Sequence, residues 1–303
     1  MKKHSIFLLL TIAANYISAS YSIPQKMVDI DELNMVGPHP ERITLPLKLL
    51  KNHSNMRINS MLVFGPSGTG RSKYAEEIAR VADCNFIEVS GHEFASGNEP
   101  IQRLKNVFIQ AKQGGSLVPN FDPSKPTVIS IKDTDAISNQ YNEATTNTAI
   151  ALWASLDRID NTNIFVFLST QHPNRFHHQL LRRMGLKVET KLPDEATRQK
   201  LFKFYLADFP ELEEHFEKFV KASNKASHKD IARACSNAIQ TMHYQETILT
   251  PELVLIELAK EINTQSTWAY ISELAKNNPI LTVALTTGAV AAVVASAYGC
   301  TRR

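Results

Sequence analysis

Residues 61–72 read MLVFGPSGTGRS, and this short stretch decides the fold of the chain. Its first four residues, Met61–Phe64, form a compact apolar run that is typical of a buried parallel strand. A glycine-rich stretch follows at once, and the segment from Ser72 to Val81 then places apolar side chains at helical spacing. The pattern therefore predicts a strand, a tight turn and a helix in direct succession.

The same alternation continues along the next hundred residues. Further strands are predicted at 86–89, 127–131 and 164–169, and they are separated by helices at 101–112 and 145–157. Strands joined by helices of this length form a parallel sheet that is covered on both faces. We therefore expect an α/β fold with three layers built around a parallel sheet.

The character of the sequence changes at Pro193, after which the strand signals stop. Helices are predicted at about 195–206, 211–222, 228–243 and 251–262. A smaller all-helical unit should therefore follow the sheet. No internal repeat is apparent.

Composition excludes several classes of protein. The 303 residues are 43% apolar and 21% charged, which is ordinary for a packed globular protein. The formal charge is only +3 and no local basic stripe is present, so the sequence does not indicate a nucleic-acid partner. Cys84, Cys235 and Cys300 are far apart and odd in number, and they predict neither a metal site nor a disulfide framework.

Both ends of the chain carry apolar segments. Residues 1–22 begin with Lys2-Lys3, continue with an apolar core and end in small residues, which predicts a signal peptide or N-terminal anchor. Residues 279–299 are free of charge and long enough to cross a bilayer, so they predict a transmembrane helix. In either case the alternative is a helix buried in the folded protein.

The two terminal predictions leave the location of the protein open. If both segments insert, the basic residues at the two ends place these ends in the cytosol and the folded domain across the membrane, exported or in an organelle lumen. If only the C-terminal segment inserts, the protein is tail-anchored with its domain in the cytosol.

The turn after the first strand has the spacing of a phosphate-binding motif. Residues 65–72, here called the phosphate loop, match G-x-x-x-x-G-K-[ST] at every fixed position except Arg71, where the motif has lysine. Glycines let backbone N–H groups wrap a phosphate chain, and the helix that follows contributes its positive dipole end. The alternative is a turn that only connects strand to helix. The predicted nucleotide-binding residues are Gly65, Pro66, Ser67, Gly68, Thr69, Gly70, Arg71 and Ser72.

Beyond the phosphate loop, the sequence from about 43 to 262 resembles the AAA family of P-loop ATPases. The similar segments, in the family's order, are 86–91, 126–137 (PTVISIKDTDAI, like its Walker B strand), 164–173, 180–183, 192–198 and 227–231. The resemblance implies an α/β nucleotide-binding domain at 43–192 and a helical lid at 193–265. It also implies ATP or ADP in the cleft between them and an oligomeric ring.

The resemblance further implies roles for individual residues. Ser72 would reach a Mg²⁺ ion, and Gln171 would stand at the sensor-1 position and orient water. Arg183 would extend to the γ-phosphate of the neighbouring subunit, completing its site. The position of a second arginine finger holds Leu186, which carries no charge.

The motifs also depart from the family pattern. Lys132 stands where the metal-supporting aspartate belongs, and Asp133 stands where the catalytic glutamate belongs. A lysine ~4 Å from Mg²⁺ would be repelled by roughly 2 kcal/mol in water and about 8 kcal/mol at an effective dielectric constant of 20. A one-residue slip with a bulge would instead make Asp133 the metal-side carboxylate.

Two functions follow from these departures. The first is a nucleotide-binding scaffold or regulatory subunit with weak or absent hydrolysis and little need for Mg²⁺. The second is an active ATPase that remodels protein or membrane partners, with Asp133 as the water-activating carboxylate. The sequence does not identify the client, and residues 95–100 lack the aromatic residue of the family's pore loop.

Overall fold

The computed structural model of the chain describes residues 35, 44–51, 58–138, 143–160, 162–262, 270–273 and 275–276. The predicted terminal segments, 1–22 and 279–299, lie outside these residues. Within the described part of the chain, no helix combines the length and the apolar character that crossing a membrane requires.

A parallel sheet of five strands forms the centre of the α/β part. The strands are β1 (Ser60–Phe64), β2 (Asn85–Ser90), β3 (Thr127–Lys132), β4 (Ile164–Thr170) and β5 (Leu186–Glu189), and their order in the sheet is β2-β3-β4-β1-β5. The first four confirm the predicted strands to within two residues. Strand β5 was not predicted, because it has only four residues and alternates buried with exposed side chains beside a single neighbour, β1.

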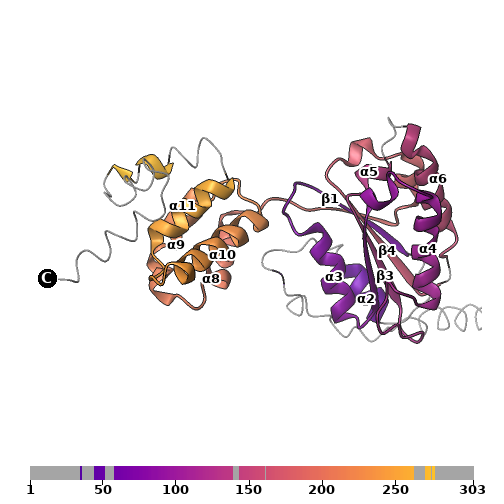
Figure 1. Cartoon of the computed structure of the whole chain (residues 1–303), viewed down its shortest axis with the longest axis horizontal. Helices are drawn as coiled ribbons and strands as arrows, with labels where there is room; N and C mark the ends of the chain where they lie inside the picture. The colour runs from indigo at the N-terminus through magenta and orange to yellow at the C-terminus, as the bar shows by residue number, and fades with distance from the viewer. Residues whose placement is uncertain are drawn as a thin grey trace, which may run out of the picture. The chain divides into compact units, whose positions relative to one another are not determined.

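Helices cover both faces of this sheet. They are α2 (Thr44–Lys51), α3 (Arg71–Val81), α4 (Pro100–Gln113), α5 (Asp135–Ser138), α6 (Glu143–Asp157) and α7 (His178–Arg183), with 3-10 turns at Gly91–Phe94 and Pro173–Arg175. Figure 1 shows α2 and α3 on one face and α4, α5 and α6 on the other. The three-layer architecture is therefore confirmed.

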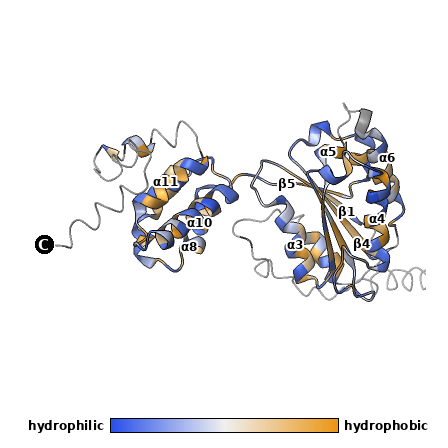
Figure 2. Cartoon of the chain, in the orientation of Figure 1, coloured by the Kyte–Doolittle hydropathy of each residue, from blue (hydrophilic) through white to orange (hydrophobic). Residues whose placement is uncertain are grey.

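The core of this part lies between the sheet and the α4–α6 layer. Ile129, Val166 and Leu168 from the central strands are completely buried together with Leu104 and Leu152 from the helices. In Figure 2 these strands are coloured as hydrophobic along most of their length. Central strands buried on both faces leave only their carboxyl ends free to carry polar chemistry.

The helical unit after the sheet has a core of its own. Its elements are α8 (Glu195–Tyr205), a 3-10 helix (Pro210–His215), α9 (Phe216–Ala222), α10 (His228–Tyr244) and α11 (Pro251–Ile262). Phe202 and Phe219 are fully buried at its centre, with ring centroids 5.5 Å apart. The helix predicted at 211–222 is instead two elements, because the segment begins with a 3-10 helix at Pro210.

Side-chain caps fix where the helices nearest the phosphate loop begin. The Asp194 carboxylate accepts a hydrogen bond from the Thr197 N–H at 2.8 Å and starts α8. Ser227 and Asp230 form a capping box that starts α10. These caps set the first turn of each helix, and both first turns line the cavity described next.

Candidate functional site

The backbone of the phosphate loop requires its glycines. Gly65, Gly68 and Gly70 have φ angles of 147°, 76° and 82°, in the region that side chains disfavour. A Cβ on Gly65 would lie 2.2 Å from the Thr190 carbonyl oxygen, and one on Gly68 would lie 2.2 Å from the Ser227 hydroxyl. The loop therefore passes between β5 and the start of α10 at distances that only glycine permits.

Arg71 folds back along the phosphate loop. Its Nη1 donates to the carbonyl oxygens of Gly65 and Pro66, which come from the start of the same loop. Burial lowers the pKa of Arg71, although the charges of Asp133 and Asp135 oppose this shift. Its Nε is buried and has no hydrogen-bond partner among the described residues. A buried cationic donor without an acceptor suits an anionic ligand.

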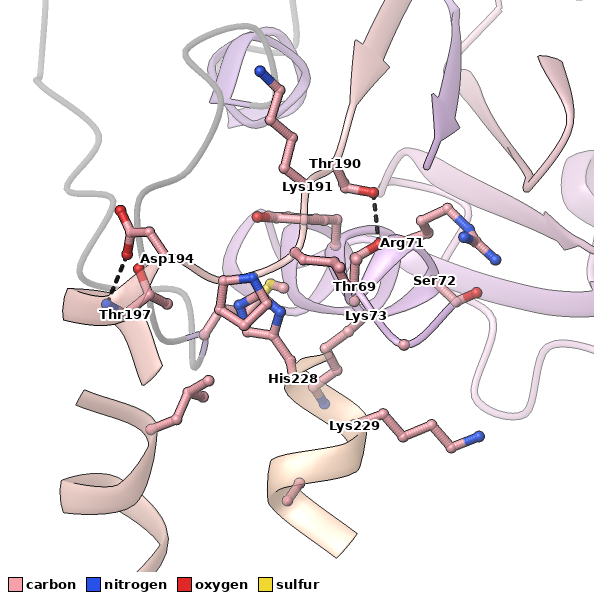
Figure 3. Close-up of a pocket in the computed structure, with 18 of the residues that line it drawn as sticks. Thr69, Arg71, Ser72, Lys73, Thr190, Lys191, Asp194, Thr197, His228 and Lys229 are labelled. Carbon is pink, nitrogen blue, oxygen red and sulfur yellow. Dashed lines mark hydrogen bonds between the residues drawn. The ribbon is translucent and has the colours of Figure 1, made fainter. Parts of the chain in front are cut away.

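A cavity of about 890 Å³ opens beside the loop. Five basic side chains and two acidic ones are among its lining residues, so the surface favours a polyanion. The basic residues are Arg71, Lys73, Lys132, Lys191 and Lys229, and the acidic ones are Glu189 and Asp194. Figure 3 shows Arg71 and Lys73 at the start of α3, Lys191 and Asp194 in the connection between β5 and α8, and Lys229 at the start of α10. Lys132 ends β3, and Glu189 ends β5.

The helical unit contacts the phosphate loop directly. The Lys229 N–H donates to the Gly68 carbonyl oxygen at 3.1 Å, and His228 and Lys229 both line the cavity. Leu201, Phe204 and Tyr205 of α8 line it as well. The resemblance implied a nucleotide cleft between the two parts, but it did not indicate that these residues of α8 line it. No local pattern in the sequence predicts the contact between the helical unit and the phosphate loop.

Lys132 ends β3 and lines the cavity together with Ser72. Its Nζ donates to Glu88 Oε1 of the adjacent strand β2 at 2.7 Å, and both side chains are 36% exposed. Because Lys132 is paired and partly exposed, its repulsion of a Mg²⁺ ion would be nearer the roughly 2 kcal/mol given above for water than the about 8 kcal/mol given for a dielectric constant of 20. Glu88 is a functional candidate that the sequence alone did not indicate.

Asp133 leaves the strand instead of extending it. β3 pairs with β2 in continuous register through Ser90 and Lys132, so the one-residue slip that would give Asp133 the metal-side position is absent. Asp133 itself has a φ of 49°, and its charge acts on the guanidinium of Arg71. It is not among the residues that line the cavity.

Asp135 organises the end of β4. Its Oδ1 accepts a hydrogen bond from the Thr170 hydroxyl, and its Oδ2 accepts one from the Gln171 N–H at 3.1 Å. The Gln171 side chain is exposed and does not line the cavity. The resemblance implied that Gln171 stands at the sensor-1 position and orients water, whereas the structure brings Thr170 and Asp135 together.

The residues present fit a polyphosphate better than a metal held by protein carboxylates. Ser72 lines the cavity and supplies one hydroxyl. Across the residues that the structure describes, no group of three or more His, Cys, Asp or Glu side chains is arranged to hold a metal ion. Any Mg²⁺ here would depend on Ser72, on the phosphates of its ligand and on water.

Arg183 lies at the end of α7 and is bound within its own chain. Its guanidinium donates to both carboxylate oxygens of Asp157, at 2.7 and 2.9 Å, and to the Gln179 carbonyl at 3.0 Å. Its Cζ also lies 5.7 Å from the centroid of the Trp153 ring. The structure therefore holds Arg183 to Asp157, where the resemblance implied a side chain extended towards a neighbouring subunit.

Comparison with known proteins supports the same family. Residues 61–192 match the model of the "ATPase family associated with various cellular activities (AAA)". The chain is 27% identical over 226 residues to the cell division cycle protein 48 homolog of Archaeoglobus fulgidus, covering 70% of this chain and 29% of that protein. It is 29% identical over 214 residues to the 26S proteasome subunit RPT4 of Saccharomyces cerevisiae, covering 65% and 47%.

A third relative is the proteasome-activating nucleotidase of Methanococcus vannielii, which is 24% identical over 220 residues, covering 68% of this chain and 52% of that protein. The chain thus spans about half, or less, of the length of these relatives. The parallel sheet, the glycine loop between β1 and α3 and the match over 61–192 agree with one another. The chain therefore carries an AAA domain over residues 61–192.

Proposed function

We propose that this chain binds ATP or ADP through the polyphosphate with little need for Mg²⁺, hydrolyses ATP slowly or not at all, and acts as a scaffold or regulatory subunit. The observation that carries the proposal is the position of Lys132, which lines the cavity with Ser72. The ammonium of Lys132 supplies positive charge at the position where the family has an aspartate that supports the metal ion.

The phosphate loop supports the binding half of the proposal. Its backbone conformation and the unsatisfied Nε of Arg71 suit a phosphate chain. Phosphoryl transfer depends on positioning and on stabilisation of spreading charge. Arg71 is committed to two loop carbonyls, and Lys132 is committed to Glu88. We therefore expect slow turnover, because Arg71 and Lys132 are bound to protein groups and neither is positioned by a catalytic metal ion.

A titration with and without a chelator tests the metal requirement. We expect the dissociation constant for ATP to change less than about threefold when Mg²⁺ is removed, which corresponds to well under 1.4 kcal/mol. Lys132→Asp should make binding depend on Mg²⁺, because a carboxylate would replace the cation. Glu88→Gln is the matched control, since it removes the partner of Lys132 and leaves the lysine. A tenfold loss of affinity for the unmodified protein on chelation would contradict the proposal.

An active ATPase is the second candidate. The charges of Asp133 and Asp135 act on Arg71, so carboxylates are close to the phosphate loop. Asp133 would then activate water, with Gln171 orienting it. Steady-state turnover that is abolished by Asp133→Asn would favour this candidate over the scaffold.

Assembly and location are further proposals. Two of the relatives are named as a 26S proteasome subunit and as a proteasome-activating nucleotidase. We infer a homo- or hetero-oligomeric ring for this chain, with a protein client and no nucleic acid. Sedimentation with and without ATP would test the ring.

We also propose that residues 279–299 attach the chain to a membrane. Their length and lack of charge in the sequence support this. Deletion of 277–303 should release the protein from carbonate-washed membranes. Protease protection of the folded domain in intact membranes would separate an exported or luminal location from a tail-anchored cytosolic one.

A further inference from the structure

Two buried threonines join the phosphate loop to the end of β5. Thr69 stands between Gly68 and Gly70 of the loop, and Thr190 follows the last residue of β5. Each threonine is only 4% exposed, and their Oγ1 atoms lie 2.7 Å apart. Figure 3 marks this hydrogen bond with a dashed line. It connects the turn that would surround a phosphate to the segment that leads from β5 into α8.

Each of the two hydroxyls also lies near a carbonyl oxygen. Thr69 Oγ1 is 2.8 Å from the oxygen of Pro66, within the loop. Thr190 Oγ1 is 3.2 Å from the oxygen of Phe64, at the end of β1. Both carbonyl oxygens have a second donor, which is Nη1 of Arg71 in the first case and the Thr190 N–H, at 2.8 Å, in the second. The two hydroxyls can therefore bond to each other without leaving a carbonyl oxygen unpaired.

Thr190 is the fixed member of this pair. The bond from its N–H to Phe64 continues the pairing of β5 with β1, in which Phe64 lies opposite Glu189. Thr190 also faces the first residue of the loop, because a Cβ on Gly65 would lie 2.6 Å from its Oγ1. Its hydroxyl therefore fills the space between the start of the phosphate loop and Thr69.

We propose that Thr190 is a positioning residue for the phosphate loop: its hydroxyl holds Thr69 close to β5 and so sets where the N–H groups of the loop meet the polyphosphate. This inference rests on the proposed function, because it names a residue of the sheet that acts on the same loop. Two oxygens approach to 2.7 Å only when they share a hydrogen bond. A methyl carbon and an oxygen meet at roughly 3.5 Å, so a methyl at this point would displace the loop by about 0.8 Å.

Substitutions at Thr190 separate the hydrogen bond from the space that the hydroxyl fills. Thr190→Ser keeps the hydroxyl, Thr190→Ala removes it, and Thr190→Val puts a methyl in its place. Thr69→Val makes the same change from the loop side and replaces Thr190→Val if that variant does not fold. The matched control is Thr127→Val, which replaces a buried hydroxyl that donates to the Ala111 carbonyl at 3.0 Å. Thr127 begins β3, whereas the cavity-lining Lys132 ends it.

The experiment is calorimetric titration of the full chain with ATP and with inorganic tripolyphosphate in the presence of a chelator. We expect Thr190→Val to weaken the binding of both ligands about tenfold, or about 1.4 kcal/mol. Thr190→Ala should weaken it about threefold, or well under 1.4 kcal/mol, because it removes the bond without pushing the loop away. Thr190→Ser should restore the affinity of the unmodified protein. Thr127→Val should lower stability in urea unfolding and leave both affinities unchanged.

The failure of this inference differs from the failure of the proposed function. If the unmodified protein binds ATP and Thr190→Val binds it equally well, the role of Thr190 is overturned and nucleotide binding stands. Equal losses for Thr190→Ala and Thr190→Val would also overturn it, because the position of the loop would then have no effect. A loss for ATP without one for tripolyphosphate would do the same, since the loop contacts phosphates. If the unmodified protein binds neither ligand, both this inference and the proposed function are overturned.

Discussion

Arg183 and Asp157 form a two-point ion pair, with Nε 2.7 Å from Oδ1 and Nη2 2.9 Å from Oδ2. The pair joins the last residue of α7 to the last residue of α6. Because Arg183 also donates to Gln179 and lies over Trp153, its guanidinium is fixed on its own chain. Any contact of Arg183 with a neighbouring subunit must first break these bonds.

This ion pair should make stability depend on pH. The hydrogen bond from Arg183 lowers the pKa of Asp157 in the folded state. The stabilisation is therefore present above the ordinary Asp pKa of about 3.9 and is lost as the pH falls through the lower, folded-state pKa. Because the carboxylate is 52% exposed, Asp157→Asn should cost only about 0.5–1 kcal/mol at pH 7.

Urea unfolding at a series of pH values measures this difference. The cost of Asp157→Asn should shrink as the pH falls below about 4. Asp208→Asn, at an exposed carboxylate of the helical unit, is the control and should have little effect throughout. A cost that stays constant from pH 7 to the acid limit of folding would show that the ion pair is not its source.

Asp135 should matter more for stability than Gln171. Asp135→Ala leaves the Thr170 hydroxyl and the Gln171 N–H without their shared acceptor, and we expect a loss of about 2 kcal/mol. Gln171→Ala removes an exposed side chain and should change stability by less than about 0.5 kcal/mol. Thermal unfolding of the two variants compares them. Equal costs would mean that Asp135 does not hold the end of β4.

Gly65 should tolerate a side chain less well than Gly97. Both have positive φ angles, but a Cβ on Gly65 would lie 2.2 Å from the Thr190 carbonyl, whereas one on Gly97 meets only the end of the Arg103 side chain at 3.3 Å. Gly97→Ala should therefore cost about 1–2 kcal/mol from backbone strain alone. Gly65→Ala should cost clearly more, because β5 must shift. Chemical denaturation measures both variants, and a similar cost would contradict the close approach.

The two cysteines in the described residues should react slowly. Burial raises the pKa of the Cys84 thiol and of the Cys235 thiol to about 12 each. At pH 8 only about one thiol in 10⁴ would then be ionised, and the thiolate is the reactive form. In a Cys300→Ser variant, alkylation followed by mass spectrometry should show little labelling until urea is added. Rapid labelling of either residue in the folded protein would contradict this expectation.

The sequence predicted the α/β part well where its signals are local. Residues 61–72 fixed a strand, a glycine turn and a helix, because apolar runs and glycine spacing act over a few residues. It did not predict β5, since Leu186–Glu189 is short and its burial depends on β1 beside it. Nor did it predict the break at Pro210, where a 3-10 helix precedes α9.

What the sequence by itself determined is the chemistry of the phosphate loop: glycines where the backbone needs positive φ, a cation at Arg71 and a lysine at the end of β3. Only the tertiary structure decided the partners of those charges. Lys132 meets Glu88, Arg183 meets Asp157, and Lys229 lies beside Gly68, to whose carbonyl oxygen its N–H donates. The reason is physical: residue types and local spacing are written along the chain, whereas ion pairs between distant residues exist only after strands and helices have packed.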